Sequence, residues 1–246
     1  MDPWENETLL WHDEFDDTEI NPQNWSVDTG KNSGWGNHEL QEYTPQNASI
    51  QLVDKATCLV ITALRERHGW TSARLKSKDR QVFQGGKIEA RIKLPQGQGM
   101  WPAFWMLGEN IDQHSWPACG EIDIMEMVGG NVWPNSDAIV YETLHWGSSR
   151  EHLLTDPNNF YRLSQGRFSE DFHTFGIDWT PGRIDWYVDG TLRGSHSLRR
   201  RSMGTAFQQP FYLLLNLAVG GVWPGYPDET TPETQSMAID WVRVYR

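Results

Sequence analysis

The sequence predicts an all-β protein in which short antiparallel strands form a sandwich or a barrel. The segment from Lys87 to Leu94 alternates strictly between polar and apolar residues, which is the period of a strand with one buried face. Glycine (22 residues) and proline (13 residues) recur at intervals along the 246-residue chain and supply turns. No window sustains the spacing of an amphipathic helix. Many short strands separated by turns are typical of such a layered β fold.

Several further segments have the composition of strands, because each is short and either alternates in polarity or is rich in β-branched and aromatic residues. These strands are expected at 59–64, 139–146, 173–179, 184–188, 211–217 and 236–245. The dipeptide Asp189-Gly190 joins the segment 184–188 to a second short run, Thr191 to Arg193. Such a pair favours the type I′ turn of a hairpin, because both central positions need positive φ. Residues 110–115 are expected to form one short helical turn.

The composition excludes two classes of function. The 33 acidic residues outnumber the 21 basic ones and give a net charge of −12, which argues against binding to duplex nucleic acid. The longest apolar run, Phe211 to Val219, is far shorter than the roughly 18 residues of a membrane span and is interrupted by Asn216. We therefore expect neither a nucleic-acid partner nor a membrane-embedded segment.

Nothing in the chain marks a boundary between domains, since it contains no linker, internal repeat or low-complexity tract. We expect a single domain over residues 1–246 and a monomer. Cys58 and Cys119 allow at most one disulfide, and two buried thiols are the preferred interpretation. The acidic, polar residues 1–5 do not resemble a signal peptide, so the protein is either cytoplasmic or has lost its leader.

Three carboxylates lie within six residues, at Glu121, Asp123 and Glu126. On a strand, Glu121 and Asp123 point to one face and the two isoleucines that alternate with them point to the other. Regular alternation would bury Glu126 on the apolar face, at a high cost for an unpaired carboxylate. One extra residue near Met125 would return Glu126 to the face of the other two acids. We therefore predict a β-bulge there.

Three acids on one face repel one another, so at least one should stay protonated near neutral pH. Glycoside hydrolysis needs this combination, an ionised carboxylate as nucleophile and a carboxylic acid that protonates the leaving oxygen. Asp123, between the two glutamates, could share a proton with Glu121. An ordinary strand with a solvated acidic face and a carboxylate metal site are the alternatives.

Tryptophan is unusually frequent, with 14 residues, which is more than a core of this size needs. Trp25, Trp179, Trp186 and Trp241 are expected in the core or in strand packing. The remaining ones that we single out lie in the 99–105 motif or in segments typical of loops: Trp35, Trp101, Trp105, Trp116, Trp133, Trp146 and Trp223. Flat apolar rings with a polar edge suit the faces of sugar rings. A groove lined with tryptophan beside paired acids would therefore suit a polysaccharide.

Other polar residues could complete such a groove. Asn37, Glu39 and Arg74 could form hydrogen bonds with sugar hydroxyls. His145 lies on the expected strand 139–146 and could form a hydrogen bond with a catalytic carboxylate, although a purely structural histidine is an equal alternative.

Taken together, six segments in order along the chain resemble glycoside hydrolase family 16, in particular its laminarinase branch of endo-β-1,3-glucanases. Residues 121–126 resemble the family's E-x-D-x-x-E signature. The other five segments are 35–41, 97–108, 143–146, 216–221 and 240–245. The resemblance implies a β-jelly-roll sandwich of two antiparallel sheets, with a substrate cleft on the concave face. It also implies retaining hydrolysis of β-1,3-glucan without a catalytic cofactor.

By the same resemblance, Glu121 matches the family's nucleophile, Glu126 its general acid/base, Asp123 its assisting carboxylate and His145 the histidine beside them. The positions that match glucan contacts are Asn37, Arg74, Trp101, Trp105, Trp116 and Trp223. Val222 stands where the family usually has asparagine, which is expected to alter one subsite. The segment 133–135 is expected to reshape the cleft.

Family members often hold a structural Ca²⁺ far from the cleft, and the matching positions are Glu14 and Asp240. A third ligand is typically the carbonyl of a glycine, which the turn 54–58 lacks. We expect a secreted or extracytoplasmic enzyme whose leader has been removed.

Two kinds of rival stay open. The same scaffold hosts β-1,3-1,4-glucanases, agarases, carrageenases and transglycosylases, although the acidic net charge disfavours a heavily sulfated substrate. A non-catalytic β-glucan-binding lectin is less expected, because Glu121 and Glu126 are both present.

Overall fold

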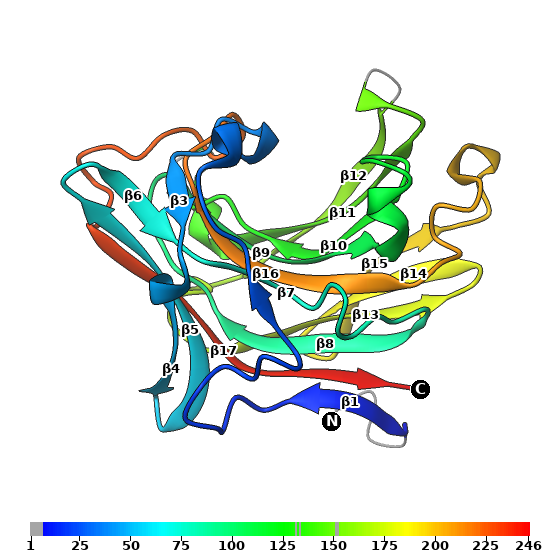
Figure 1. Cartoon of the computed structure of the whole chain (residues 1–246), viewed down its shortest axis with the longest axis horizontal. Coiled ribbons are helices and arrows are strands. Elements are labelled where there is room, and N and C mark those ends of the chain that lie inside the picture. Colours follow the sequence, from blue (N-terminus) through cyan, green and yellow to red (C-terminus); the bar gives the residue numbers. More distant parts are fainter. Residues whose placement is uncertain (1–6, 131, 133, 151–152) are drawn as a thin grey trace.

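The computed structural model describes residues 7–130, 132, 134–150 and 153–246 and confirms an all-β fold of two sheets (Figure 1). The ten-stranded sheet follows the order β15 (Thr191–Ser197), β14 (Arg183–Val188), β13 (His173–Thr180), β8 (Gly86–Lys93), β17 (Thr234–Tyr245), β5 (Ala56–Glu66), β6 (Gly69–Ser72) and β3 (Gln41–Tyr43), with β1 (Leu9–Asp13) on β17 and β4 (Ala48–Val53) on β5. The seven-stranded sheet follows the order β12 (Leu153–Arg162), β11 (Ile139–Gly147), β10 (Glu121–Glu126), β9 (Met100–Gly108), β16 (Phe211–Val219), β7 (Arg74–Lys76) and β2 (Ser26–Val27).

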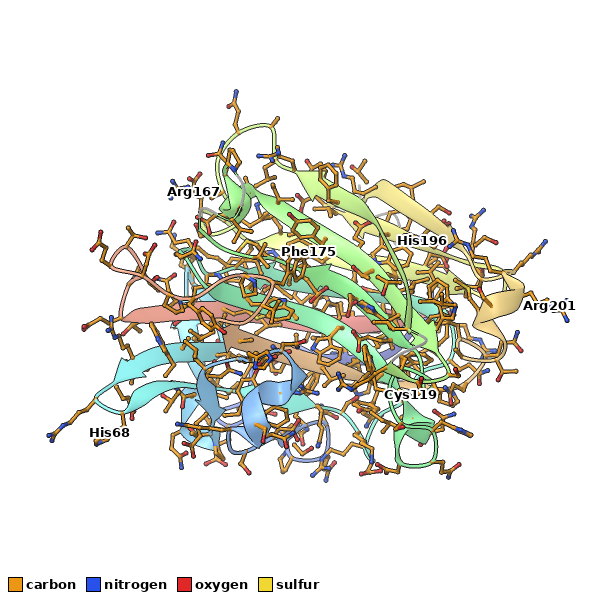
Figure 2. All side chains as sticks on the ribbon, turned by 90° about the horizontal axis from the view of Figure 1, so that it is seen from above. His68, Cys119, Arg167, Phe175, His196 and Arg201 are labelled. Atoms are coloured by element: carbon orange, nitrogen blue, oxygen red, sulfur yellow. The ribbon has the colours of Figure 1, made fainter. Side chains whose placement is uncertain are left out.

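The two sheets form a sandwich whose layers lie one above the other in Figure 1. Seen from above, His68 and Arg201 lie at opposite ends of the molecule (Figure 2). Among the described pairings, all are antiparallel except that of β3 with β6. The helical elements within the described ranges are short 3-10 turns, such as η3 (Glu109–Asp112). None of them is long and apolar enough to cross a bilayer.

The core lies between the sheets and is built by the inward-facing residues of alternating strands. On β8, Ile88, Ala90 and Ile92 are fully buried, as the polar–apolar alternation of this segment predicts. Trp186 reaches across the sandwich, since its Nε1 donates to the carbonyl of Asp123 at 3.0 Å. The hydrogen bond ties the ten-stranded sheet to the strand that carries the acids.

Most of the expected elements are confirmed. The seven expected strands correspond to β5, β8, β11, β13, β14, β16 and β17. Asp189 and Gly190 have φ values of 50° and 67° and connect β14 to β15 in a two-residue hairpin turn, as predicted. η3 corresponds to the expected helical turn. Several strands were not predicted, among them β12 and also β9, which carries both tryptophans of the 99–105 motif.

The structure also bears on the cysteines and on the placement of the tryptophans. Cys58 and Cys119 are both buried and free, which confirms the preferred interpretation of two thiols.

Trp25, Trp179 and Trp186 lie in the core as expected. Trp146 lies on β11, within the expected strand 139–146, and is buried in the core, so its grouping with the loop tryptophans was wrong.

Candidate active site

The three acids lie on β10, between β9 and β11, and a bulge sets their direction. Asp123 pairs with Trp105 of β9, whereas Met125, two residues later, pairs with the adjacent Phe104. The strand therefore gains one residue relative to β9, at the predicted place. Glu126 consequently lines the same cleft as the other acids, while Met125 is fully buried.

A cleft of about 630 Å³ lies on the outer face of the seven-stranded sheet. Its lining includes every residue expected to take part in catalysis or in glucan binding: Asn37, Arg74, Trp101, Trp105, Trp116, Glu121, Asp123, Glu126, His145 and Trp223. These residues come from β7, β9, β10, β11 and the loops before β3, before β10 and after β16. The fold thus brings together side chains that are far apart in the sequence.

Each glutamate accepts a hydrogen bond from one tryptophan. Nε1 of Trp116 lies 2.7 Å from Oε2 of Glu121. Nε1 of Trp101 lies 3.0 Å from Oε1 of Glu126. Sequence reasoning assigned both rings to sugar contacts and missed these bonds. They form because the indole N–H is a donor that needs a partner when it is half-buried.

His145 lies between the acids and β12. Its Nε2 is 3.2 Å from Oδ2 of Asp123 and 3.6 Å from Oε1 of Glu121. Its Nδ1 is 2.9 Å from Oγ1 of Thr155. Burial opposes protonation, but the contact with Asp123 and the charges of both glutamates raise the pKa of His145 to about 9. The imidazolium therefore supplies a positive charge among the three carboxyl groups.

The two glutamates differ in their electrostatic surroundings. Burial raises the pKa of both carboxyls above the usual 4.5, and the charge of Asp123 adds to this effect. For both glutamates, the positive charge of His145 and one tryptophan hydrogen bond oppose the rise in pKa, and for Glu121 the charge of Arg74 opposes it as well. The pKa of Glu126 is raised further by the charge of Glu121 and lies well above its usual value. Glu126 is thus the carboxyl that is better suited to keep a proton.

Arg74 is fixed between two aromatic rings. Its guanidinium carbon lies 5.0 Å from the ring centre of Trp35 and 4.8 Å from that of Trp105. Its Nε is 3.2 Å from a carboxylate oxygen of Asp28, which neutralises part of its charge. Nε1 of Trp105 donates to Asn216 at 2.7 Å. This platform presents a planar cation and two rings to the cleft.

A half-buried carboxyl holds the loop that carries Asn37. Nδ2 of Asn37 donates to Oε1 of Glu39 at 3.0 Å, and Nε2 of Gln41 donates to Oε2 at 2.6 Å. Burial raises the pKa of Glu39. The backbone N–H of Val222 donates to the carbonyl of Asn37 at 3.0 Å, which joins this loop to the segment after β16.

Other expectations about the cleft have mixed outcomes. The ring centre of Trp223 lies 5.5 Å from that of Trp101 and 5.0 Å from that of Tyr141, in edge-on arrangements. The side chain of Val222 is 74% exposed and does not line the cleft. An altered subsite at this position stays a prediction. Of the segment 133–135, expected to reshape the cleft, Trp133 lies outside the described residues, and Pro134 and Asn135 do not line the cleft.

The side chains expected to bind calcium do not fit such a site. Glu14 forms two hydrogen bonds with Arg243, at 2.9 and 2.8 Å. Asp240 is paired with Arg91 at 2.6 Å. Both carboxylates are therefore neutralised by arginine. Among the residues that the structure describes, the group of acids and histidines whose ligand atoms converge is Glu121, Asp123 and His145.

Sequence reasoning missed several residues of the cleft, and three of them have polar side chains that contact or flank the site. Thr155 holds His145 and lies on a strand that the sequence did not predict. Asn216 is the polar interruption of the apolar strand β16, and that interruption was the available signal. The guanidinium carbon of Arg150 lies 4.8 Å from the ring centre of Trp116.

The comparisons with known proteins agree with this geometry. Residues 28–243 match the family "Glycosyl hydrolases family 16". The laminarinase catalytic domain from Thermotoga maritima, solved in complex with cetyltrimethylammonium bromide, is 43% identical, with a TM-score of 0.88 over 98% of this chain and 99% of that one.

Two further relatives cover nearly as much. The endo-β-1,3-glucanase from Pyrococcus furiosus is 44% identical, with a TM-score of 0.85 over 96% of this chain and 93% of that one. A β-glucanase of Rhodothermus marinus is 38% identical over 99% of this chain and 85% of its own length. The fold, the three acids on the bulged strand and these matches together show that the chain belongs to glycoside hydrolase family 16.

Proposed function

We propose that the protein is a retaining endo-β-1,3-glucanase, with residues 1–246 acting as one catalytic domain. The observation that carries the proposal is the pair Glu121 and Glu126, which the bulge in β10 brings to one cleft with different surroundings. Laminarinase and endo-β-1,3-glucanase are the activities named for the solved structures above, and these relatives support the choice of β-1,3-glucan.

The reaction proceeds by double displacement. A carboxylate oxygen of Glu121 attacks the anomeric carbon while Glu126 gives its proton to the departing glycosidic oxygen. A covalent glycosyl-enzyme forms, and Glu126 then takes a proton from the water that releases the sugar from Glu121. No cofactor enters either step.

Two electrostatic differences favour these roles over the exchanged ones: the charge of Arg74 lowers the pKa of Glu121, whereas the charge of Glu121 raises the pKa of Glu126. The nucleophile must be ionised, and His145 and the indole N–H of Trp116 both stabilise the carboxylate of Glu121. The acid must hold a proton, and the charges of Asp123 and Glu121 favour the protonated form of Glu126. When Glu121 becomes an ester, its negative charge is lost, so the pKa of Glu126 falls as its role changes to that of a base.

Asp123 and His145 do not react themselves but influence the neighbouring Glu121. Asp123 is only 2% exposed and contacts the imidazole of His145. This contact orients the ring and keeps a positive charge near Glu121. We therefore assign both as positioning residues for the nucleophile.

The substrate side of the cleft supports a neutral glucan. Trp101, Trp105, Trp116 and Trp223 offer apolar rings, and Asn37 offers an amide that Glu39 holds in place. The charge of Arg74 is already shared with Asp28. A β-1,3-1,4-glucanase, an agarase or a transglycosylase stays the alternative within the same fold, and a lectin is the alternative without catalysis.

The central test is the variant Glu121→Gln, which keeps the shape of the side chain and removes the nucleophile. We expect it to lose laminarin hydrolysis and to keep the circular-dichroism spectrum and unfolding temperature of a folded protein. Near-normal activity would refute the role of Glu121. Proton NMR of the first products should show that the configuration at the anomeric carbon is retained. Retention also implies that the carboxyl groups of Glu121 and Glu126 are about 5–5.5 Å apart.

The substrate is tested by product chromatography on laminarin, lichenan and agarose in parallel. We expect oligosaccharides of several lengths from laminarin, as endo cleavage requires. Release from lichenan or agarose without release from laminarin would refute the β-1,3-glucan assignment. Products longer than the starting oligosaccharide would indicate a transglycosylase.

We further propose that the protein works outside the cytoplasm as a monomer. The many hydroxyls of a glucan polymer make its passage through a lipid bilayer costly, so an enzyme that degrades extracellular glucan must work outside the cell membrane. Structural calcium is not part of the proposal, because arginines already pair with Glu14 and Asp240. Cell fractionation and light scattering test location and oligomeric state.

A further inference from the structure

Three ligand atoms of the catalytic cluster converge on one point. They are Oε1 of Glu121, Oδ2 of Asp123 and Nε2 of His145, and all of them lie within 4.8 Å of one another. The first two come from β10 and the third from β11, where Glu121 pairs directly with His145. The rigid pairing of adjacent strands sets this spacing.

The spacing matches the edges of a small tetrahedron. Zn²⁺ binds nitrogen and carboxylate oxygen at about 2.0–2.2 Å, so two ligands of a tetrahedral ion are about 3.3–3.6 Å apart. Nε2 of His145 lies 3.2 Å from the Asp123 oxygen and 3.6 Å from the Glu121 oxygen. The Glu121 and Asp123 oxygens lie within 4.8 Å of each other, so these two carboxylates would have to close on a bound ion.

The second polar atom of His145 and that of Glu121 are already engaged, which leaves their converging atoms for a metal. Nδ1 of His145 is held by Thr155 at 2.9 Å, and Oε2 of Glu121 accepts the Trp116 hydrogen bond at 2.7 Å. Oδ2 of Asp123 is buried, has no hydrogen-bond partner among the described residues and is directed at His145. Such outer partners orient metal ligands.

We propose that this cluster is a binding site for a borderline-soft divalent cation such as Zn²⁺ or Cu²⁺, and that the cation inhibits the enzyme reversibly. A set of one imidazole and two carboxylates with an open fourth position suits Zn²⁺, whereas Ca²⁺ and Mg²⁺ prefer six or more oxygen ligands. The ion would displace the proton from Nε2 of the His145 imidazolium, which passes to solvent, because only the neutral ring binds a metal. The bound ion would occupy the oxygen of Glu121 that must attack the sugar. The inhibition rests on the proposed function, but the binding does not.

Binding is tested on chelator-treated protein by titration calorimetry with ZnCl₂, using Glu126→Gln so that catalysis plays no part. We expect one tight Zn²⁺ per chain and no comparable binding of CaCl₂ or MgCl₂. Adding His145→Ala should weaken binding at least tenfold, and Thr155→Val should weaken it about tenfold through the loss of a ligand's orienting partner. Asp123→Asn serves as a second ligand variant if the alanine variant does not fold.

His173→Ala provides the matched control, because Nδ1 of His173 lies 2.8 Å from Oδ2 of Asp189 in a histidine–aspartate pair away from the cleft. This variant should keep the tight site. Equal Zn²⁺ affinity with and without His145, or no saturable binding, would overturn the proposal.

Inhibition is measured as the rate of laminarin hydrolysis at rising ZnCl₂, followed by addition of EDTA. We expect loss of activity at the concentration that fills the site and recovery with EDTA. Full activity of wild type with the site filled would overturn the inhibitory role. If the metal-free wild type hydrolyses no laminarin while Zn²⁺ still binds, the proposed function fails and the metal site stands.

Discussion

Trp101 donates a hydrogen bond from Nε1 to Oε1 of Glu126 at 3.0 Å, across the adjacent strands β9 and β10. The ring of Trp101 lines the cleft and also contacts Trp223 edge-on. The indole therefore has two roles. Its apolar surface is available to a sugar, and its N–H stabilises the ionised form of the proposed acid/base.

The variant Trp101→Phe keeps an aromatic ring and removes the donor. Because this hydrogen bond lowers the pKa of Glu126, its loss should raise that pKa further and shift the basic limb of the pH–rate profile to higher pH. We expect kcat to fall about tenfold, since a hydrogen bond to a charged group contributes about 1.5–3 kcal/mol. Initial rates on laminarin across the pH range test this, and an unmoved basic limb would contradict it.

Trp116→Phe is the corresponding change at the proposed nucleophile. Loss of the 2.7 Å hydrogen bond should raise the pKa of Glu121, so that a higher pH is needed to ionise it. The acid limb of the profile should therefore move to higher pH, while the basic limb stays in place. The two variants control each other. If Trp116→Phe moved the basic limb instead, the roles of the two glutamates would be exchanged.

Arg74→Lys tests the platform between Trp35 and Trp105. A lysine keeps the charge but cannot stack as a planar group between two rings. We expect KM for laminarin oligosaccharides to rise about fivefold, in line with roughly 1 kcal/mol for a cation–π contact, and kcat to change less than KM. Steady-state kinetics separate the two constants. A large loss of kcat at constant KM would place Arg74 in the chemical step instead.

Glu142 gives a prediction about stability. It is 1% exposed, neither of its carboxyl oxygens has a hydrogen-bond partner among the described residues, and burial raises its pKa from 4.5 to about 8. In the folded protein the group stays protonated over a range where the unfolded chain releases its proton. Its contribution to stability is complete below about pH 4.5 and is lost as pH rises to about 8.

The variant Glu142→Gln removes this titration while nearly keeping the side-chain shape. We expect the difference in free energy of unfolding, variant minus wild type, to increase by up to about 4 kcal/mol from pH 5 to pH 8. Urea unfolding of both proteins at the two pH values measures the difference. A difference that does not change with pH would show that Glu142 does not carry the expected shift.

The bulge in β10 shows what local pattern can predict. Two carboxylates at alternate positions and a third at an odd spacing conflict with strand periodicity, and one extra residue at Met125 resolves the conflict. The clustering of Asn37, Arg74 and Trp223 around this strand could not be obtained in that way. Their placement depends on the order of strands in the sheet, and only the family resemblance indicated it.

The failures have physical causes as well. β9 contains Pro102 and a dense run of aromatic residues, and both hide the alternation that marks a strand. The context of Trp146 resembled that of the loop tryptophans, but β11 continues to Gly147 and directs the ring into the core. Thr155 contacts His145 through the pairing of β11 with β12, which is a long-range contact without a local signal.

The two free cysteines allow the opening of each sheet to be measured by thiol labelling. Cys58 is buried with Val60 and Ala238 at the ten-stranded sheet, and Cys119 is buried with Leu107 and Tyr212 at the seven-stranded sheet. A thiol reagent can reach each sulfur only when its own sheet opens. The labelling rates of the two cysteines would therefore time the opening of each sheet separately, without any introduced probe, and would show whether bound glucan slows only the sheet that holds it.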